Sequence, residues 1–134
     1  MTEKDLHIQV CNYIRYKYPA VRFTSNYGAG IKLTMHQASV QRKQQSHSGY
    51  PDLFVIYNNG KYSGLFIELK KDGVRLTKKD GTPASGHLTR QDEYLEYLRS
   101  QGFSAVFCIG YDDAIATIDE YLGINTTKVE FKNL

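Results

Sequence analysis

Two short apolar segments decide the fold: GYPDLFVIY at residues 49–57 and GLFIELK at residues 64–70. Asn58-Asn59-Gly60 lies between them and is typical of a β-hairpin turn. If the segments pair antiparallel about Gly60, Asp52 faces Glu68, because the numbers of opposed residues in a hairpin have a constant sum. A two-residue turn at Asn59-Gly60 would instead place Asp52 beside Ile67, so the register stays open by one residue.

The acidic residues of these segments form a candidate metal site. Side chains alternate along a strand, so Glu68 and Lys70 project to one face and Leu69 to the other. Opposed Cβ atoms lie roughly 4.5–5.5 Å apart, so Asp52 and Glu68 can share a divalent cation at about 2.0–2.6 Å. An unpaired carboxylate inside an apolar run is costly, and a cation with Lys70 compensates the charge of Glu68. Alternatively, the acids only end two strands and Lys70 forms a surface ion pair.

Length and composition indicate a single domain, residues 1–134, that buries a core without disulfides. Cys11 and Cys108 lie far apart in apolar patterns, and no signal peptide or long apolar span is visible, so we expect a cytoplasmic protein that does not enter a membrane. The four histidines lack the spacing of a zinc site.

The net charge of +3 is too small to demonstrate a nucleic-acid partner, but the basic residues are clustered. One cluster follows Lys70 and another lies in the polar stretch before Tyr50. Their alternative role is to form solvated loops. The predicted nucleic-acid contacts are Arg42, Lys43, Lys71, Arg75, Lys78 and Lys79.

The first part of the chain predicts one helix and one strand before the hairpin. Thr2 is a helix N-cap, the helix carries an apolar stripe, and Pro19 ends it. A short strand follows at Val21 to Ser25. The polar stretch 26–50 contains one possible helix, beginning at Thr34.

The second part predicts a helix, a buried strand and a further helix. Residues 71–86 form a basic, mobile loop with a turn at Lys79-Asp80-Gly81. We expect a helix from Arg90 to about Gln101 capped by Thr89, a strand at residues 104–109, and a helix capped by Asp112. Residues 128–131 are expected to form an edge strand.

The resulting order of elements, αβββαβα, predicts an α/β fold in which helices flank a mixed sheet. A right-handed crossover should place the strand at residues 104–109 parallel to the strand that carries Glu68.

Five motifs follow one another along the chain: Gly49-Tyr50-Pro51-Asp52-Leu53, Ile67-Glu68-Leu69-Lys70, His87-Leu88-Thr89-Arg90-Gln91 with Tyr94 and Leu98, Gly102-Phe103-Ser104-Ala105, and Gly110-Tyr111-Asp112-Asp113-Ala114 with Ile118 and Tyr121-Leu122. As an ordered set they resemble the VRR-NUC domain, a branch of the PD-(D/E)-x-K nuclease superfamily with a restriction-endonuclease-like fold. The last motif is most similar to the small stand-alone phage members, which implies a phage or prophage product in a bacterial host.

The resemblance assigns roles to individual residues. It implies that Asp52 and Glu68 bind Mg²⁺ or Mn²⁺, that the Leu69 carbonyl completes the coordination, and that Lys70 positions or helps to deprotonate the attacking water. Gln91 would orient Lys70 or the water, or alternatively form a simple hydrogen bond on the helix surface. Glu3 would be a further metal ligand, or alternatively a first-turn residue favoured by the helix dipole.

The resemblance therefore implies a metal-dependent DNA endonuclease, selective for branched DNA and similar to a dimeric Holliday-junction resolvase. The stretch 27–45 and the tail from Lys128 are candidate dimer faces. An alternative is a module that binds branched or single-stranded DNA with weak or partner-dependent cleavage. Cleavage of RNA is a third idea, although no RNA-recognition motif is visible.

Overall fold

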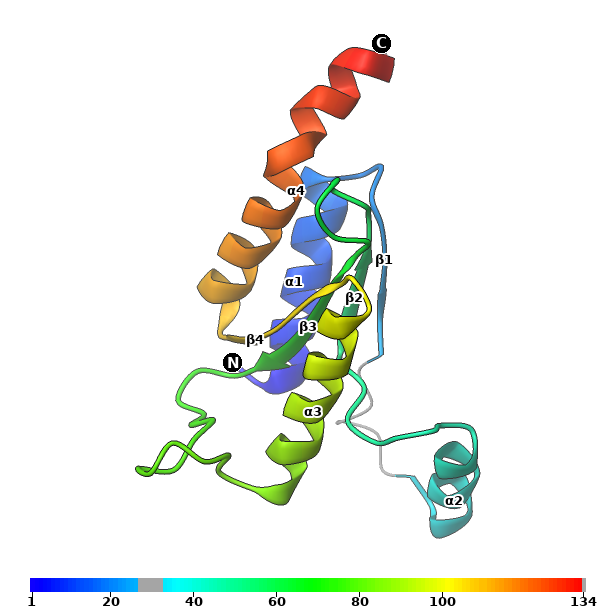
Figure 1. The fold of residues 1–134 in the computed structure, drawn as a ribbon, viewed down its shortest axis with the longest axis vertical. Coiled ribbons are helices and arrows are strands. Elements are labelled where there is room, and N and C mark those ends of the chain that lie inside the picture. Colours follow the sequence, from blue (N-terminus) through cyan, green and yellow to red (C-terminus); the bar gives the residue numbers. More distant parts are fainter. Residues whose placement is uncertain (27–32, 134) are drawn as a thin grey trace.

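The structure, a computed structural model, describes residues 1–26 and 33–133, with side chains through Gly123. Its elements follow the predicted order, and they include the short helix that was expected after Thr34 (Figure 1). They are α1 Glu3–Lys17, β1 Arg22–Ser25, α2 Met35–Lys43, β2 Leu53–Ile56, β3 Leu65–Lys70, α3 Gly86–Ser100, β4 Ser104–Ile109 and α4 Tyr111–Asn133.

The sheet is mixed, with strand order β1-β2-β3-β4. β1 and β3 pair antiparallel with β2, while β4 is parallel to β3 across the α3 crossover, as predicted. The pairs Leu53–Ile67 and Val55–Leu65 settle the register in favour of pairing about Gly60. The connection, residues 57–64, is longer than a two-residue turn, and Asn59 holds it by donating to the Tyr121 carbonyl of α4 at 3.2 Å.

Helices cover both faces of the sheet (Figure 1). α1 and α4 pack on one face, over an aliphatic core to which β3 contributes Leu65, Ile67 and Leu69. α3 packs on the other face through Leu95 and Leu98, against a cluster rich in phenylalanine. Because side chains alternate along β3, Glu68 and Lys70 project to the α3 face.

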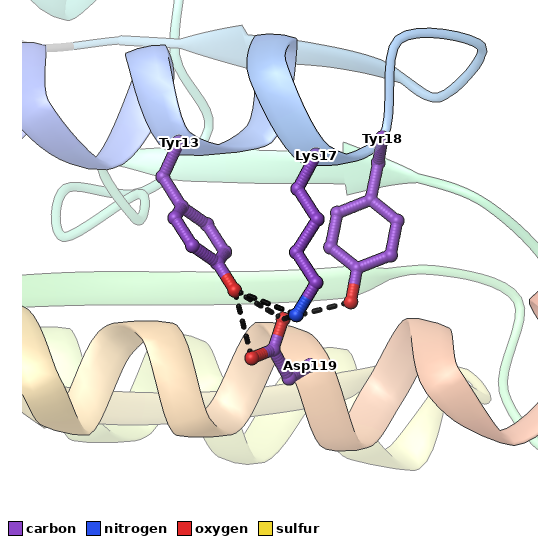
Figure 2. Close-up of polar contacts among 4 residues, drawn as sticks. All are labelled: Tyr13, Lys17, Tyr18 and Asp119. Carbon is purple, nitrogen blue, oxygen red and sulfur yellow. Dashed lines mark hydrogen bonds and ion pairs between the residues drawn. The ribbon is translucent and has the colours of Figure 1, made fainter.

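A polar cluster joins α1 to α4 (Figure 2). The Asp119 carboxylate accepts hydrogen bonds from the Tyr13 hydroxyl at 2.8 Å and the Tyr18 hydroxyl at 2.7 Å. Lys17 Nζ lies 3.2 Å from the same carboxylate. The cluster fixes the C-terminal end of α1 on α4. It was not predicted, since Asp119 is more than a hundred positions from the other three residues in the chain.

Local capping explains where most helices begin. Thr2 and Thr34 cap α1 and α2, and each forms a capping box with the residue three positions later. The predicted turn at residues 79–81 is present, because Gly81 N–H donates to the Lys78 carbonyl at 3.0 Å. In the described part of the chain, no helix combines the length and apolar character needed to cross a membrane.

The structure differs from the predictions at two helix starts and at one expected strand. α3 begins at Gly86, because Ser85 rather than Thr89 accepts the capping hydrogen bond, from Leu88 N–H at 3.1 Å. α4 already includes Asp112 in its first turn, and Gly110 precedes it. The predicted edge strand at residues 128–131 is wrong, since α4 continues to Asn133. A four-residue alternation is too short to separate a period of two from the helical period.

Candidate active site

β2 and β3 bring Asp52 and Glu68 to the same end of the sheet. Asp52 directly precedes β2, and extending the observed register places it opposite Glu68. Its Oδ2 accepts a hydrogen bond from Leu69 N–H at 3.0 Å, so the side chain continues the ladder where β2 has no further residue to pair. The Asp52 carboxylate is thereby held at the end of the β2–β3 pair.

Glu68 is buried in an environment that disfavours its charge. Its side chain is 3% exposed, and burial together with the nearby Asp52 carboxyl raises the pKa of Glu68 to about 9. Lys70 Nζ lies 3.4 Å from Glu68 Oε2 and acts in the opposite direction. Glu68 Oε1 is buried and has no hydrogen-bond partner among the described residues. A second positive charge beside Lys70 would favour the ionised form of Glu68.

These residues fit a hard divalent cation. Carboxylate oxygens are the ligands that Mg²⁺ and Mn²⁺ prefer, and Glu68 Oε1 is an acceptor without a donor in the described structure. Within residues 1–26 and 33–123, no three His, Cys, Asp or Glu side chains are arranged to hold an ion. Two carboxylates would thus supply the side-chain ligands, which suits Mg²⁺, because this ion keeps several waters.

His7 on α1 is a neighbour of the site that the sequence reasoning missed. Its Nε2 lies 3.7 Å from Asp52 Oδ2, and its side chain is 3% exposed. Burial lowers the pKa of His7, although the charges of Asp52 and Glu3 oppose the shift. The ring is therefore neutral at pH 7. The available signal was its position in the apolar stripe of α1, between Leu6 and Val10.

Glu3 lies one turn before His7 on α1 and is half-buried. Its charge acts on His7 and thus reaches the border of the site, while its role as a metal ligand stays a prediction. The same holds for the Leu69 carbonyl, because the contact found at Leu69 is made by its N–H.

Gln91 lies on the face of α3 that packs on the sheet and is 5% exposed. It belongs to the second turn of α3, because the helix begins earlier than predicted. Since α3 connects two parallel strands, it runs opposite to β3, and its N-terminal half lies toward the end of β3 that carries Glu68. Gln91 Oε1 is a second buried acceptor with no hydrogen-bond partner in the described part of the chain.

The predicted nucleic-acid contacts lie in segments near this end of the sheet, and not among the carboxylates themselves. All six are exposed. Four lie in the loop of residues 71–85 and two in the last turn of α2. In Figure 1 the loop and α2 both project beyond the end of the sheet where β3 finishes, one on each side of α3.

Comparison with solved structures finds a VRR_NUC domain protein of similar fold, with a TM-score of 0.69 and 26% sequence identity over 92% of this chain and 90% of that chain. The predicted VRR-NUC resemblance is confirmed. No protein-family model and no curated protein matches the sequence. The mixed sheet flanked by helices is accordingly an α/β fold consistent with the VRR-NUC and restriction-endonuclease-like fold, with the Asp52, Glu68 and Lys70 cluster at one end of its sheet.

Proposed function

We propose that the protein is a metal-dependent endonuclease that hydrolyses phosphodiester bonds in DNA. The observation that carries this proposal is the meeting of two carboxylates and one lysine at a buried point, where Glu68 Oε1 has no donor among the described residues. The similarity to a VRR_NUC domain protein supports a nuclease-type function independently of that geometry.

In this proposal Asp52 and Glu68 hold Mg²⁺ or Mn²⁺, and the Leu69 carbonyl and Glu3 are further candidate ligands. When bound, the cation polarises the scissile phosphate and lowers the pKa of a bound water. Lys70 Nζ contacts one oxygen of Glu68, which leaves its other protons for the attacking water or a phosphate oxygen. Its charge stabilises the negative charge that develops as the new P–O bond forms and the bond to the leaving oxygen breaks. Gln91 orients Lys70 or the water.

The exposed lysine and arginine side chains on both sides of the site favour DNA as the substrate, because contacts to phosphates supply most of the affinity for nucleic acid. We extend the proposal to branched DNA cut by a homodimer, in which two copies would make paired cuts. This extension, and a phage or prophage origin, rest on the likeness to stand-alone phage members. Of the two candidate dimer faces, residues 27–32 and the side chains of the tail from Lys128 lie outside what the structure describes.

A DNA-binding module is the second candidate function. It is favoured by the finding that, within the described residues, only two acidic side chains converge and no group of three is arranged around an ion. Such a module would hold branched or single-stranded DNA through the same basic residues and would cleave it weakly or only with a partner.

Cleavage of defined DNA substrates tests the proposal. A four-way junction, a flap, a linear duplex and a single strand are incubated with Mg²⁺, Mn²⁺ or EDTA. Wild type is compared with Lys70→Ala and with Lys61→Ala, a control in which an exposed lysine is removed beyond the opposite end of β3.

We expect cutting with either metal, no cutting in EDTA, loss of cutting in Lys70→Ala and normal cutting in Lys61→Ala. DNA binding should persist in Lys70→Ala, because phosphate contacts elsewhere supply the affinity. Paired symmetric cuts in the junction would support the resolvase. Binding without cleavage of any substrate would support the binding module.

A further inference from the structure

A pocket of about 440 Å³ lies beside the candidate active site, between the segment that leads to Asp52 and the outer face of α3. Residues 46–48 form one wall, and α3 contributes Arg90, Glu93, Tyr94 and Tyr97. Its volume falls within the range of about 300–1,000 Å³ that is usual for small-ligand sites. None of the residues that line it has a role in the chemistry described above.

The pocket and the carboxylate site share α3. Arg90, Tyr94 and Tyr97 recur at helical spacing on one side of α3, whereas Gln91 follows Arg90 and faces the sheet. Gly49 joins the two sites through the backbone: it has φ +97°, and a Cβ at this position would lie 2.7 Å from the Arg90 carbonyl oxygen. A group bound in the pocket would therefore contact residues 46–48, which come shortly before Asp52 in the chain.

Aromatic side chains connect the pocket to the protein core. Tyr94 meets Tyr50 edge to face with ring centroids 5.5 Å apart, and Tyr50 meets Phe66 in the same way at 5.8 Å. These contacts hold Tyr94 in one orientation. Tyr97, one turn further along α3, is 61% exposed, and His47 stands on the opposite wall. Aromatic rings that remain open to solvent beside a nuclease site are suited to stacking on bases.

The geometry points to a binding site for one unpaired nucleobase, which stacks on Tyr97 and His47 while Ser46, Ser48 and Glu93 present hydrogen-bonding groups to its edge. The lining carries one acid and one guanidinium, so it suits a neutral polar ring better than a phosphate, which would be repelled by Glu93. Arg90 lies at the start of the α3 wall, where it can contact the backbone phosphate of the same nucleotide.

This inference rests on the proposed function and names its substrate class: DNA with an unpaired base next to the bond that is cut. A flap, a branch point or a single strand can place a base in the pocket without disrupting a pair. A continuous duplex would first have to unstack and unpair a base, which costs a few kcal/mol.

Binding measured in EDTA tests the stacking site without cleavage. Three DNA probes are compared: a flap with 2-aminopurine at the first unpaired positions, the same flap with abasic residues there, and the fully paired duplex. The variants are Tyr97→Ala, Tyr97→Phe and His47→Ala in the full chain. Tyr16→Ala is the matched control, because Tyr16 is 90% exposed on α1 and does not line the pocket.

We expect Tyr97→Ala and His47→Ala each to weaken binding of the flap roughly tenfold, with a change of at most about twofold for the abasic flap and the duplex. The quenching of 2-aminopurine fluorescence by wild type should be lost in Tyr97→Ala. Tyr97→Phe keeps the ring and should bind as wild type does, as should Tyr16→Ala.

Equal losses on the flap and the abasic flap would overturn the inference, as would unchanged binding of the flap by Tyr97→Ala. Because these measurements need neither metal nor cleavage, they separate this inference from the nuclease. Failure of wild type to cut any DNA would refute the endonuclease, whereas selective loss in Tyr97→Ala would still support the pocket.

Discussion

Replacing Glu68 with glutamine should stabilise the metal-free protein at neutral pH. Burial and the Asp52 carboxyl raise the pKa of Glu68 from 4.5 to about 9, so the folded state keeps a proton that the unfolded state releases. Between these two pH values the folded state binds more protons, and the free energy of unfolding of wild type falls as pH rises. Glutamine has a similar shape and no proton to lose. Lys70, Asp52 and His7 are the titratable groups that face this position.

The size of the effect follows from the pKa. At pH 7 the solution is about 2.5 pH units above the unfolded pKa of Glu68, and each unit corresponds to about 1.4 kcal/mol, so the ionisable carboxyl destabilises the fold by up to about 3 kcal/mol. Lys70 loses the partner it has at 3.4 Å, which offsets roughly 1 kcal/mol of the gain. A net stabilisation of about 1–2 kcal/mol is expected.

Urea denaturation in EDTA at about pH 5 and about pH 8 measures this directly. Relative to Glu68→Gln, wild type should become less stable at the higher pH. The buried His7, whose pKa is lowered, changes the stability of both proteins with pH, so the comparison rests on the difference between them. Glu96→Gln is the control, because Glu96 is 72% exposed. Added Mg²⁺ should stabilise wild type more than Glu68→Gln. If the stability difference between Glu68→Gln and wild type did not grow from pH 5 to pH 8, or if Glu68→Gln were the less stable protein at pH 8, Lys70 alone would compensate the charge and the reasoning would be refuted.

Three further outcomes are expected. Asp119→Asn should lower the free energy of unfolding by about 1–2 kcal/mol in urea denaturation, because the helix-joining hydrogen bonds weaken. Burial alone would raise the pKa of Asp119, but its hydrogen bonds lower it, so the wild-type advantage should hold above the unfolded pKa and disappear as pH falls through the folded one. Lys78→Glu combined with Lys79→Glu should weaken DNA binding regardless of sequence and reduce the salt dependence by a slope of about 2, and an unchanged slope in a salt titration would remove the loop from the DNA interface. Gly49→Ala should lower the melting temperature more than Gly81→Ala, because both have positive φ but only the first would place a Cβ against the backbone of α3.

The parts of the fold that follow from local chemistry could be predicted from the sequence. Thr2 and Thr34 identify helix starts, because a side-chain acceptor followed three positions later by Asp or Gln forms a capping box. The start of α3 could not be identified in this way. Ser85 and Thr89 both have capping side chains, and the structure shows that the Thr89 hydroxyl donates to the Ser85 carbonyl inside the first turn.

The site was predictable where it lies on paired strands and not where it depends on packing. Strand alternation places Glu68 and Lys70 together, and the register adds Asp52. His7 comes from a helix on the other side of the sheet, and no local pattern indicates which residue it will meet. The contacts of Asp119 could not be predicted from the sequence either, since they form only when α1 and α4 pack side by side (Figure 2).

The kind of ligand that this site needs follows from the atoms left without partners. Glu68 Oε1 and Gln91 Oε1 are buried and have no hydrogen-bond partner among the described residues. Gln91 Oε1 is an acceptor, and the Glu68 carboxyl is acceptor-only once it has released its proton. Buried acceptors are satisfied by donors or by cations, and the oxygens of a phosphate supply neither. A phosphodiester could therefore approach this end of β3 favourably only with a cation, or a water held by one, between it and the two side chains. In our proposal the basic residues of the 71–85 loop and α2 attract the DNA, and the two buried oxygens without partners support a nuclease that needs a metal.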